Sequence, residues 1–166
     1  MEGVEKLLAE AEIKDLMYKR IRYMDTKQWH MYATVHTEDH VSSTYGGLPK
    51  EGQPETDGEK NKVQGHEALT NAIRTLMDEP VPMVSCHHVH SPEITFTSDT
   101  TAEGIWAMED ELWWPNGDKE ESLHGWGHYE EKYRKENGKW LICYRGLTRL
   151  RTVQTDGFYD RVKKQP

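Results

Sequence analysis

Three histidines fall within four positions in the middle of the chain, at His87, His88 and His90. The surrounding residues favour a β-strand, in which alternate side chains point to opposite faces, so His88 and His90 share one face and His87 lies on the other. Two histidines on one strand face could hold zinc, iron or manganese. The next carboxylate, Glu93, comes too soon for the cupin motif, and no second motif with a late histidine follows. A metal site at His88 and His90 is therefore the weaker hypothesis.

The stronger hypothesis needs one histidine facing a cavity and one carboxylate beside it. Imidazole titrates near neutral pH, and a carboxylate on one ring nitrogen makes the other nitrogen a capable general base. Asp25 is suitably placed to be that carboxylate, because an amphipathic helical pattern ends there and helix ends commonly border such cavities. Asp25 would also be a good N-cap for the helix that follows. The residues alone leave both interpretations open.

Two more charged residues are candidates because of the strand faces on which they lie. Asp110 is the one charge on an otherwise apolar face, and Arg149 follows Leu147 on a face of the last strand. A buried carboxylate must be paired or must lie where a ligand binds. A purely structural salt bridge with an arginine on a neighbouring strand is therefore an equal alternative for Asp110. Arg145 and Arg151 share the Arg149 face by simple alternation, and we interpret them as solvated edge charges.

The elements that would position these residues follow from the spacing of apolar side chains. Helical spacing predicts three helices, over residues 4–24, 27–36 and 65–78. A short strand over residues 40–45 precedes a polar, Gly- and Pro-rich segment at 46–64, which we interpret as a loop or lid. Four long strand-like runs separated by short turns follow, at residues 83–97, 101–114, 121–135 and 139–151. Tight turns make consecutive strands antiparallel, so we expect an α+β fold with the helices on one face of a curved sheet.

Composition limits the classes of protein that the chain can belong to. Its 166 residues predict one domain, and six Trp and eight Tyr in a chain that is only 35% hydrophobic suit a shell around an aromatic-lined cavity. The net charge of −8 makes nucleic acid a poor partner. No apolar run approaches the length of a membrane span, and the acidic amino terminus is unlike a secretory signal. Cys86 and Cys143 are expected to be free thiols, and we expect a cytoplasmic protein.

A family resemblance rests on the order of these elements, on the motifs "RYMDTKQW" and "HHVHSPEIT", and on the tail "YEEKYRKENGKWLICYRGLTRL". By these features the chain resembles the SnoaL-like branch of the NTF2-like superfamily. The resemblance covers nearly the whole chain and is strongest to bile-acid dehydratase, with scytalone dehydratase and hexachlorocyclohexane dehydrochlorinase as relatives. It implies a cone-shaped fold around an apolar pocket. It also implies an enzyme that removes a proton from carbon and expels water or halide, with no cofactor and no metal.

The resemblance also implies roles for individual residues. Asp25 matches the catalytic aspartate after the first helix, and His87 matches the catalytic histidine five residues before the proline of "PEIT". Asp110 and Arg149 match an acidic residue on the second long strand and an arginine late in the last one. Arg20 stands where bile-acid dehydratase has a tyrosine, so the donor to the leaving group differs. Side chains expected to bind the substrate are Tyr45, Arg20, Trp106, Met108, Trp126 and Tyr129.

The function that we expect is a lyase acting on a small, apolar, cyclic substrate. An isomerase or cyclase would use the same acid–base residues without a leaving group. A non-catalytic ligand-binding domain would need the pocket but not the Asp–His pair, since a fold does not fix a function. Relatives form dimers or trimers, so a homo-oligomer is expected.

Overall fold

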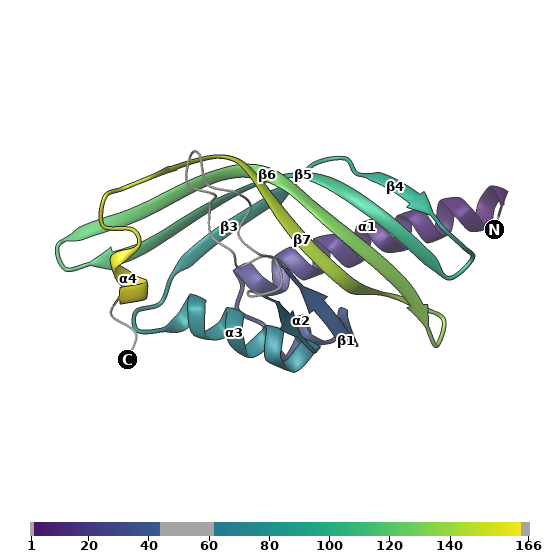
Figure 1. Ribbon diagram of the computed structural model, residues 1–166, viewed down its shortest axis with the longest axis horizontal. Coiled ribbons are helices and arrows are strands. Elements are labelled where there is room, and N and C mark those ends of the chain that lie inside the picture. Colours follow the sequence, from purple (N-terminus) through teal and green to yellow (C-terminus); the bar gives the residue numbers. More distant parts are fainter. Residues whose placement is uncertain (1, 44–61, 164–166) are drawn as a thin grey trace.

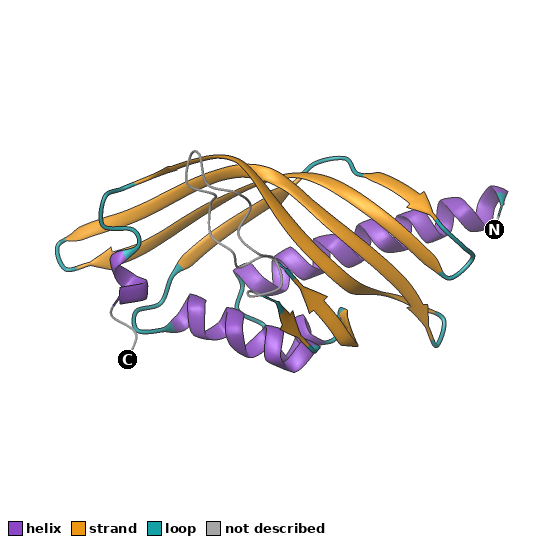
Figure 2. Cartoon of the chain, viewed as in Figure 1, coloured by secondary structure: helices purple, strands orange, loops and turns teal. Residues whose placement is uncertain are grey.

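A computed structural model describes residues 2–43 and 62–163 of the chain. It has an α+β fold with one curved sheet of seven strands (Figure 1, Figure 2). The helices are α1 (Gly3–Asp25), α2 (Trp29–Ala33), α3 (His66–Asp78) and α4 (Asp160–Lys163). The strands are β1 (His36–Ser42), β2 (Val63–Gln64), β3 (Val84–Val89), β4 (Glu93–Phe96), β5 (Thr101–Asn116), β6 (Lys119–Glu136) and β7 (Lys139–Gln154). The fold class therefore agrees with the prediction.

The sheet forms an arch over α1. In this view α2 and α3 lie below the carboxyl end of α1, on the side away from the arch (Figure 1). The strand order is β2-β1-β7-β6-β5-β3. Strand β4 also pairs with β5, at residues 102–105, whereas β3 pairs with β5 at residues 108–113. All pairings are antiparallel except the one between β1 and β7, which is parallel. The inner face of the long strands is thus the face that meets the helices, and a side chain on it is shielded from water.

The long helix α1 was predicted from its apolar stripe, and its buried positions follow the helical period. Ile13, Met17 and Met24 are buried against the sheet and form part of one core with side chains such as Trp106 and Ile142. The first turns differ from the prediction, because Val4, Leu7 and Leu8 are exposed. The first turns of α1 lie at the margin of the sheet (Figure 1). Among the described residues, no helix has the length and apolar character needed to span a membrane.

Three element boundaries differ from those expected. The run at 83–97 is two strands, β3 and β4, because Pro92 has no amide hydrogen to donate to a ladder and separates them. Strand β1 begins at His36 rather than at residue 40. Val63–Gln64, the end of the segment interpreted as a loop or lid, forms β2 and pairs with β1. The remainder of that segment up to residue 61, and Tyr45, lie outside the described residues.

Strand β7 does not alternate simply, because its register with β6 shifts twice. Tyr133 pairs with Ile142 while Lys132 pairs with Tyr144, which leaves Cys143 as an extra residue. A second shift follows: Arg149 pairs with Gly127 and Arg151 pairs with Trp126. Leu150, between the two arginines, is the extra residue. Each bulge exchanges the faces of the residues that follow it. Ile142, Arg145, Leu147 and Arg149 therefore face inward, whereas Arg151 faces outward.

Candidate active site

The end of α1 meets β3 through Asp25 and His87. Asp25 Oδ1 lies 2.5 Å from Nδ1 of His87, and Asp25 Oδ2 accepts the backbone N–H of His87 at 2.9 Å. The hydroxyl of Ser85, two residues earlier on the same strand face, donates to Asp25 Oδ1 at 2.7 Å. A carboxylate can only accept, so the hydrogen of the neutral imidazole is on Nδ1 and the lone pair is on Nε2. Asp25 is not the N-cap of α2, which is Gln28.

The free nitrogen of His87 faces a second charged pair. Its Nε2 lies 4.0 Å from Oδ2 of Asp110, its cross-strand partner on β5. Arg149 donates to both oxygens of Asp110, from Nη1 at 2.5 Å and from Nη2 at 2.6 Å. Two parallel hydrogen bonds of this kind fix the orientation of the guanidinium as well as its position.

Arg149 reaches Asp110 across the intervening strand β6, which carries a glycine at the crossing point. A Cβ atom on Gly125 would lie 2.1 Å from Nη1 of Arg149 and 2.6 Å from Oδ1 of Asp110. With any side chain at position 125, Nη1 of Arg149 and Oδ1 of Asp110 would have to move. Gly125 is thus required for the pair that faces His87.

The site is nearly closed to water and its charges are almost balanced. The side chains of His87 and Asp110 are 7% and 4% exposed, and that of Arg149 is 17% exposed. Burial acts to lower the pKa of Arg149, but the hydrogen bonds to Asp110 and its charge outweigh burial and raise it, so the guanidinium stays charged. With the imidazole in its neutral form and both carboxyl groups ionised, the four side chains carry one net negative charge. A proton taken up by His87 brings the four side chains into balance.

A second group of buried polar side chains lies farther along the inner face. Arg20 of α1 lies 5.0 Å from the ring centroid of Tyr129, and its Nη1 is 3.7 Å from Oε1 of Glu131. The indole N–H of Trp106 donates to the hydroxyl of Tyr133 at 2.7 Å. Tyr133 in turn donates to Glu131 Oε2 at 2.8 Å, and burial followed by the nearby Glu131 raises the pKa of this tyrosine. The phenol is therefore neutral.

The other two histidines of the cluster face away from this site. His88 Nε2 lies 3.6 Å from the thiol sulfur of Cys86, and His90 Nε2 lies 3.9 Å from Glu109. Within residues 2–43 and 62–163, no three His, Cys, Asp or Glu side chains are grouped so that they could hold a metal ion. The described geometry therefore does not support the metal hypothesis for His88 and His90.

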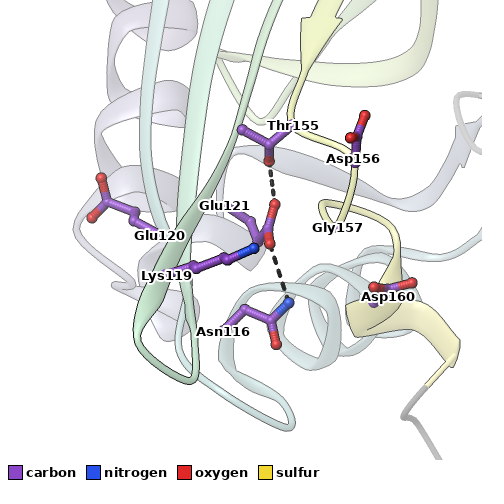
Figure 3. A pocket seen from close by; sticks show the side chains of 8 residues that line it. All are labelled: Asn116, Lys119, Glu120, Glu121, Thr155, Asp156, Gly157 and Asp160. Atoms are coloured by element: carbon purple, nitrogen blue, oxygen red, sulfur yellow. Dashed lines mark hydrogen bonds between the residues drawn. The ribbon is translucent and has the colours of Figure 1, made fainter.

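Two surface cavities are described, and neither is lined by Asp25 or His87. The larger, of about 830 Å³, lies between the β5–β6 turn and the segment before α4 (Figure 3). The carboxylate of Glu121 lies within it and accepts hydrogen bonds from Asn116 and Thr155 (Figure 3). The smaller, of about 310 Å³, is bordered by residues such as Glu12, Tyr23 and Trp140. The apolar pocket expected around the Asp–His pair remains a prediction.

A model of the SnoaL-like domain matches residues 5–146. The chain belongs to the SnoaL-like family. A proposed scytalone dehydratase of Novosphingobium aromaticivorans is similar in structure, with a TM-score of 0.70 and 17% identity over 90% of this chain and 89% of that one. The LinA-type3 hexachlorocyclohexane dehydrochlorinase of Novosphingobium barchaimii has a TM-score of 0.71 and 17% identity over 94% and 96% of the two chains. A proposed aromatic ring hydroxylase of N. aromaticivorans has a TM-score of 0.71 and 18% identity over 92% and 94%. Identities this low show a shared fold, and the activities of these proteins differ.

In this SnoaL-like chain, four of the predicted residues come together: Asp25, His87, Asp110 and Arg149. Met108 adjoins them, since its sulfur lies 3.9 Å from Nη1 of Arg149. Arg20, Tyr129 and Trp106 belong to the second buried group. Ser85 was missed, although it shares a strand face with His87 and could have been found by its spacing of two residues.

Two residues lie elsewhere than expected. Trp126 is on the outer face of the sheet, where it stacks on His124, and thus on the face opposite to that of Tyr129. Residues three apart on a strand point to opposite faces. Arg145 is not a solvated edge charge, because only 4% of it is exposed. The bulge at Cys143 and the cover of β1 on that edge of β7 place it inside.

Proposed function

We propose that this SnoaL-like chain is a cofactor-independent lyase that removes a proton from carbon in a small, apolar, cyclic substrate. The observation that supports this most directly is the contact between His87 and Asp25, which leaves Nε2 of a nearly buried imidazole free to act as a base. A base fixed in one tautomer by a carboxylate typically contributes a factor of roughly 10²–10⁴ to the rate.

In the proposed reaction, His87 Nε2 takes the proton and the C–H bonding pair becomes the new C=C bond. Hydroxide or halide leaves the adjacent carbon with the electron pair of its own bond. Where the leaving group is hydroxide, the imidazolium returns its proton to form water. Where it is halide, the imidazolium releases its proton to solvent water. Either route restores the enzyme. Asp25 and Asp110 stabilise the imidazolium in the interval.

Arg149 is proposed to stabilise the negative charge that develops on a carbonyl or leaving oxygen. A guanidinium has five N–H donors, and Asp110 occupies two of those of Arg149. The remaining donors can bind an oxygen without breaking the ion pair. Arg20, which stands where bile-acid dehydratase has a tyrosine, lies in the second buried group and is not given this role.

The proposal is tested by the exchange of substrate hydrogen and by product analysis. A panel of cyclic β-hydroxy and β-halo carbonyl compounds is incubated with the protein in D₂O, and masses are followed by chromatography. We expect C–H exchange and loss of water or halide with the wild type, and neither with His87→Ala. His88→Ala, a change to the outward neighbour, is the matched control and should keep the activity. Equal activity of His87→Ala and wild type would exclude this base.

The same experiment distinguishes the alternatives. An isomerase or cyclase would exchange hydrogen in a His87-dependent manner and give a product that differs in mass from the substrate only by the deuterium taken up. A non-catalytic binding domain would give neither change.

We also propose a homo-oligomer, a dimer or trimer, because Ile105, Leu150 and Val153 expose 44–69% of their surface on the outer face of the sheet. Light scattering on the purified protein measures its mass.

A further inference from the structure

Two arginines lie against one tyrosine ring in the second buried group. The guanidinium carbon of Arg145 is 4.4 Å from the ring centroid of Tyr129, and that of Arg20 is 5.0 Å from it. Arg20 is fully buried and Arg145 is 4% exposed. Both guanidinium groups thus lie against the same ring, away from water.

The described side chains do not balance these charges. Glu131 is the carboxylate of this group, and it lies 3.7 Å from Nη1 of Arg20. Glu131 is also the direct cross-strand partner of Arg145, yet within residues 2–43 and 62–163 no carboxylate lies within 4.0 Å of the Arg145 guanidinium. In the same part of the chain, Nε of Arg145 and Nε and Nη2 of Arg20 have no hydrogen-bond acceptor.

The neighbouring histidines supply no negative charge either. Nδ1 of His36 lies 2.8 Å from the carbonyl oxygen of Tyr32, and Nδ1 of His40 lies 3.0 Å from that of Ile142. A carbonyl only accepts, so Nδ1 carries the hydrogen in both rings. Burial is the first cause that lowers the pKa of each ring, and Arg20 lowers both further, so both are neutral. Counted over residues 2–43 and 62–163, the group keeps one positive charge in excess.

A buried cation without an anion is among the most costly features of a folded protein. The contact between Arg145 and the face of Tyr129 offsets only part of that cost. Features that reduce stability in this way are typical of binding sites, where the ligand supplies the missing partner. The missing partner here is an anion.

The position of Arg145 relates it to the proposed reaction site. Arg145 and Arg149 lie on the inner face of β7, four residues apart, which separates them by about 13 Å along the strand. Leu147 lies between them, with Tyr129 as its cross-strand partner. The surface from one arginine to the other is thus apolar in the middle and charged at both ends.

We propose that the substrate carries a carboxylate that binds to Arg145 and Arg20, with its apolar body directed towards His87. The orientation of the substrate towards His87 rests on the proposed function. Binding of an anion by Arg145 and Arg20 does not depend on catalysis. It identifies the substrate class as an apolar cyclic acid. Carboxylate oxygens would fill the empty N–H positions of both guanidinium groups.

Binding of a matched pair of probes, 2-naphthoate and 2-naphthamide, tests the site. The two have nearly the same shape and differ in charge. By calorimetry, we expect the acid to bind the wild type on the order of tenfold or more tightly than the amide. Arg145→Met should abolish the preference and Arg145→Lys should retain part of it. His87→Ala should keep it in full, which separates failure of the anion site from failure of the proposed base.

Three results would overturn the inference. The first is equal binding of acid and amide to the wild type. The second is a preference lost with Arg149→Met and kept with Arg145→Met, because the anion would then bind at the other end. The third is equal protection against heating by inorganic phosphate and by 2-naphthoate, since a small ion alone would then fill the site. Thermal unfolding checks the physical premise: without probe, Arg145→Met should unfold at the same temperature as the wild type or higher, and a lower midpoint would show that Arg145 stabilises the fold itself.

Discussion

Asp25 holds His87 at two points, through the ring nitrogen Nδ1 and through the backbone N–H of the same residue. The two contacts use different oxygens of one carboxylate, so the imidazole is fixed relative to its own backbone as well as relative to α1. With the Ser85 hydroxyl, three donors surround a group that can only accept. This arrangement determines the tautomer of His87, and it can be disturbed by changing one atom.

Asp25→Asn replaces an acceptor oxygen by an amide nitrogen among those three donors. We expect His87 to move its hydrogen to Nε2, so that Nδ1 can accept, and the proposed base then has no lone pair towards the substrate. Two-dimensional ¹⁵N NMR of the histidine rings should show the change of tautomer. The rate of C–H exchange should fall by roughly 10²–10⁴-fold.

Asp15→Asn is the matched control for that substitution, because Asp15 is on the same helix, is 61% exposed and pairs with Lys19 at the surface. It should alter neither the NMR signals of His87 nor the rate. A wild-type tautomer in Asp25→Asn would contradict the role given to the carboxylate.

The Asp110–Arg149 pair should show strong coupling in stability. Asp110→Leu or Arg149→Met alone leaves a buried charge without its partner, and we expect each to lower the free energy of unfolding by about 3–5 kcal/mol. The double variant removes both charges and should cost much less than the sum of the two. Urea denaturation of the four proteins measures this cycle. A double variant that loses the full sum would show that the pair contributes nothing as a pair.

Gly125→Ala tests the passage through which Arg149 reaches Asp110. The added Cβ would occupy the place of the Arg149 Nη1 atom, so the ion pair must separate or the strand must shift. We expect a loss of about 1–3 kcal/mol in the free energy of unfolding, with the proposed activity lost as well. Gly146→Ala on the next strand is the control. There the nearest atom is the Tyr144 hydroxyl at 3.2 Å, the far end of a side chain that can move.

Much of the fold could be predicted from local patterns. The stripe on α1, the alternation in β5 and β6 and the turn residues between the long strands each specify one element. Simple alternation failed on β7, since bulges at Cys143 and Leu150 change which face each residue takes. Bulges arise from the register between two strands, and a pattern in one strand does not record it. Arg145 was misjudged for this reason, whereas Arg151 is exposed as expected.

The candidate site was less predictable than the fold. A helix end and a histidine-rich strand suggested Asp25 and His87, but only the family resemblance selected His87 among three histidines. The contact of Arg149 with Asp110 depends on the absence of a side chain at Gly125, on a third strand between them. The lack of a described carboxylate beside Arg145 is a property of all the elements around it. Contacts that depend on three or more elements at once appear only when the chain is folded.

His36 and His40 make the stability of the protein depend on pH. Their rings lie 4.6 Å apart, centroid to centroid, on the buried side of β1. Burial, followed by the charge of the other ring and of Arg20, lowers the pKa of His36 well below its ordinary value. Burial and the charges of Arg20 and Arg145 lower the pKa of His40 from 6.5 to about 4. The folded protein therefore resists protonation at both rings.

We expect the free energy of unfolding to fall as the pH is lowered from 6.5 to about 4. In this window the unfolded chain binds a proton at His40 and the folded chain does not, so acid favours unfolding, by about 1.4 kcal/mol per pH unit and roughly 3 kcal/mol in all. His36 adds to the same trend. Urea denaturation between pH 4.5 and 8 should show a flatter dependence for His40→Gln. His88→Gln, at an exposed position, should keep the wild-type slope. An identical slope for His40→Gln and wild type would show that His40 is not the group that resists the proton.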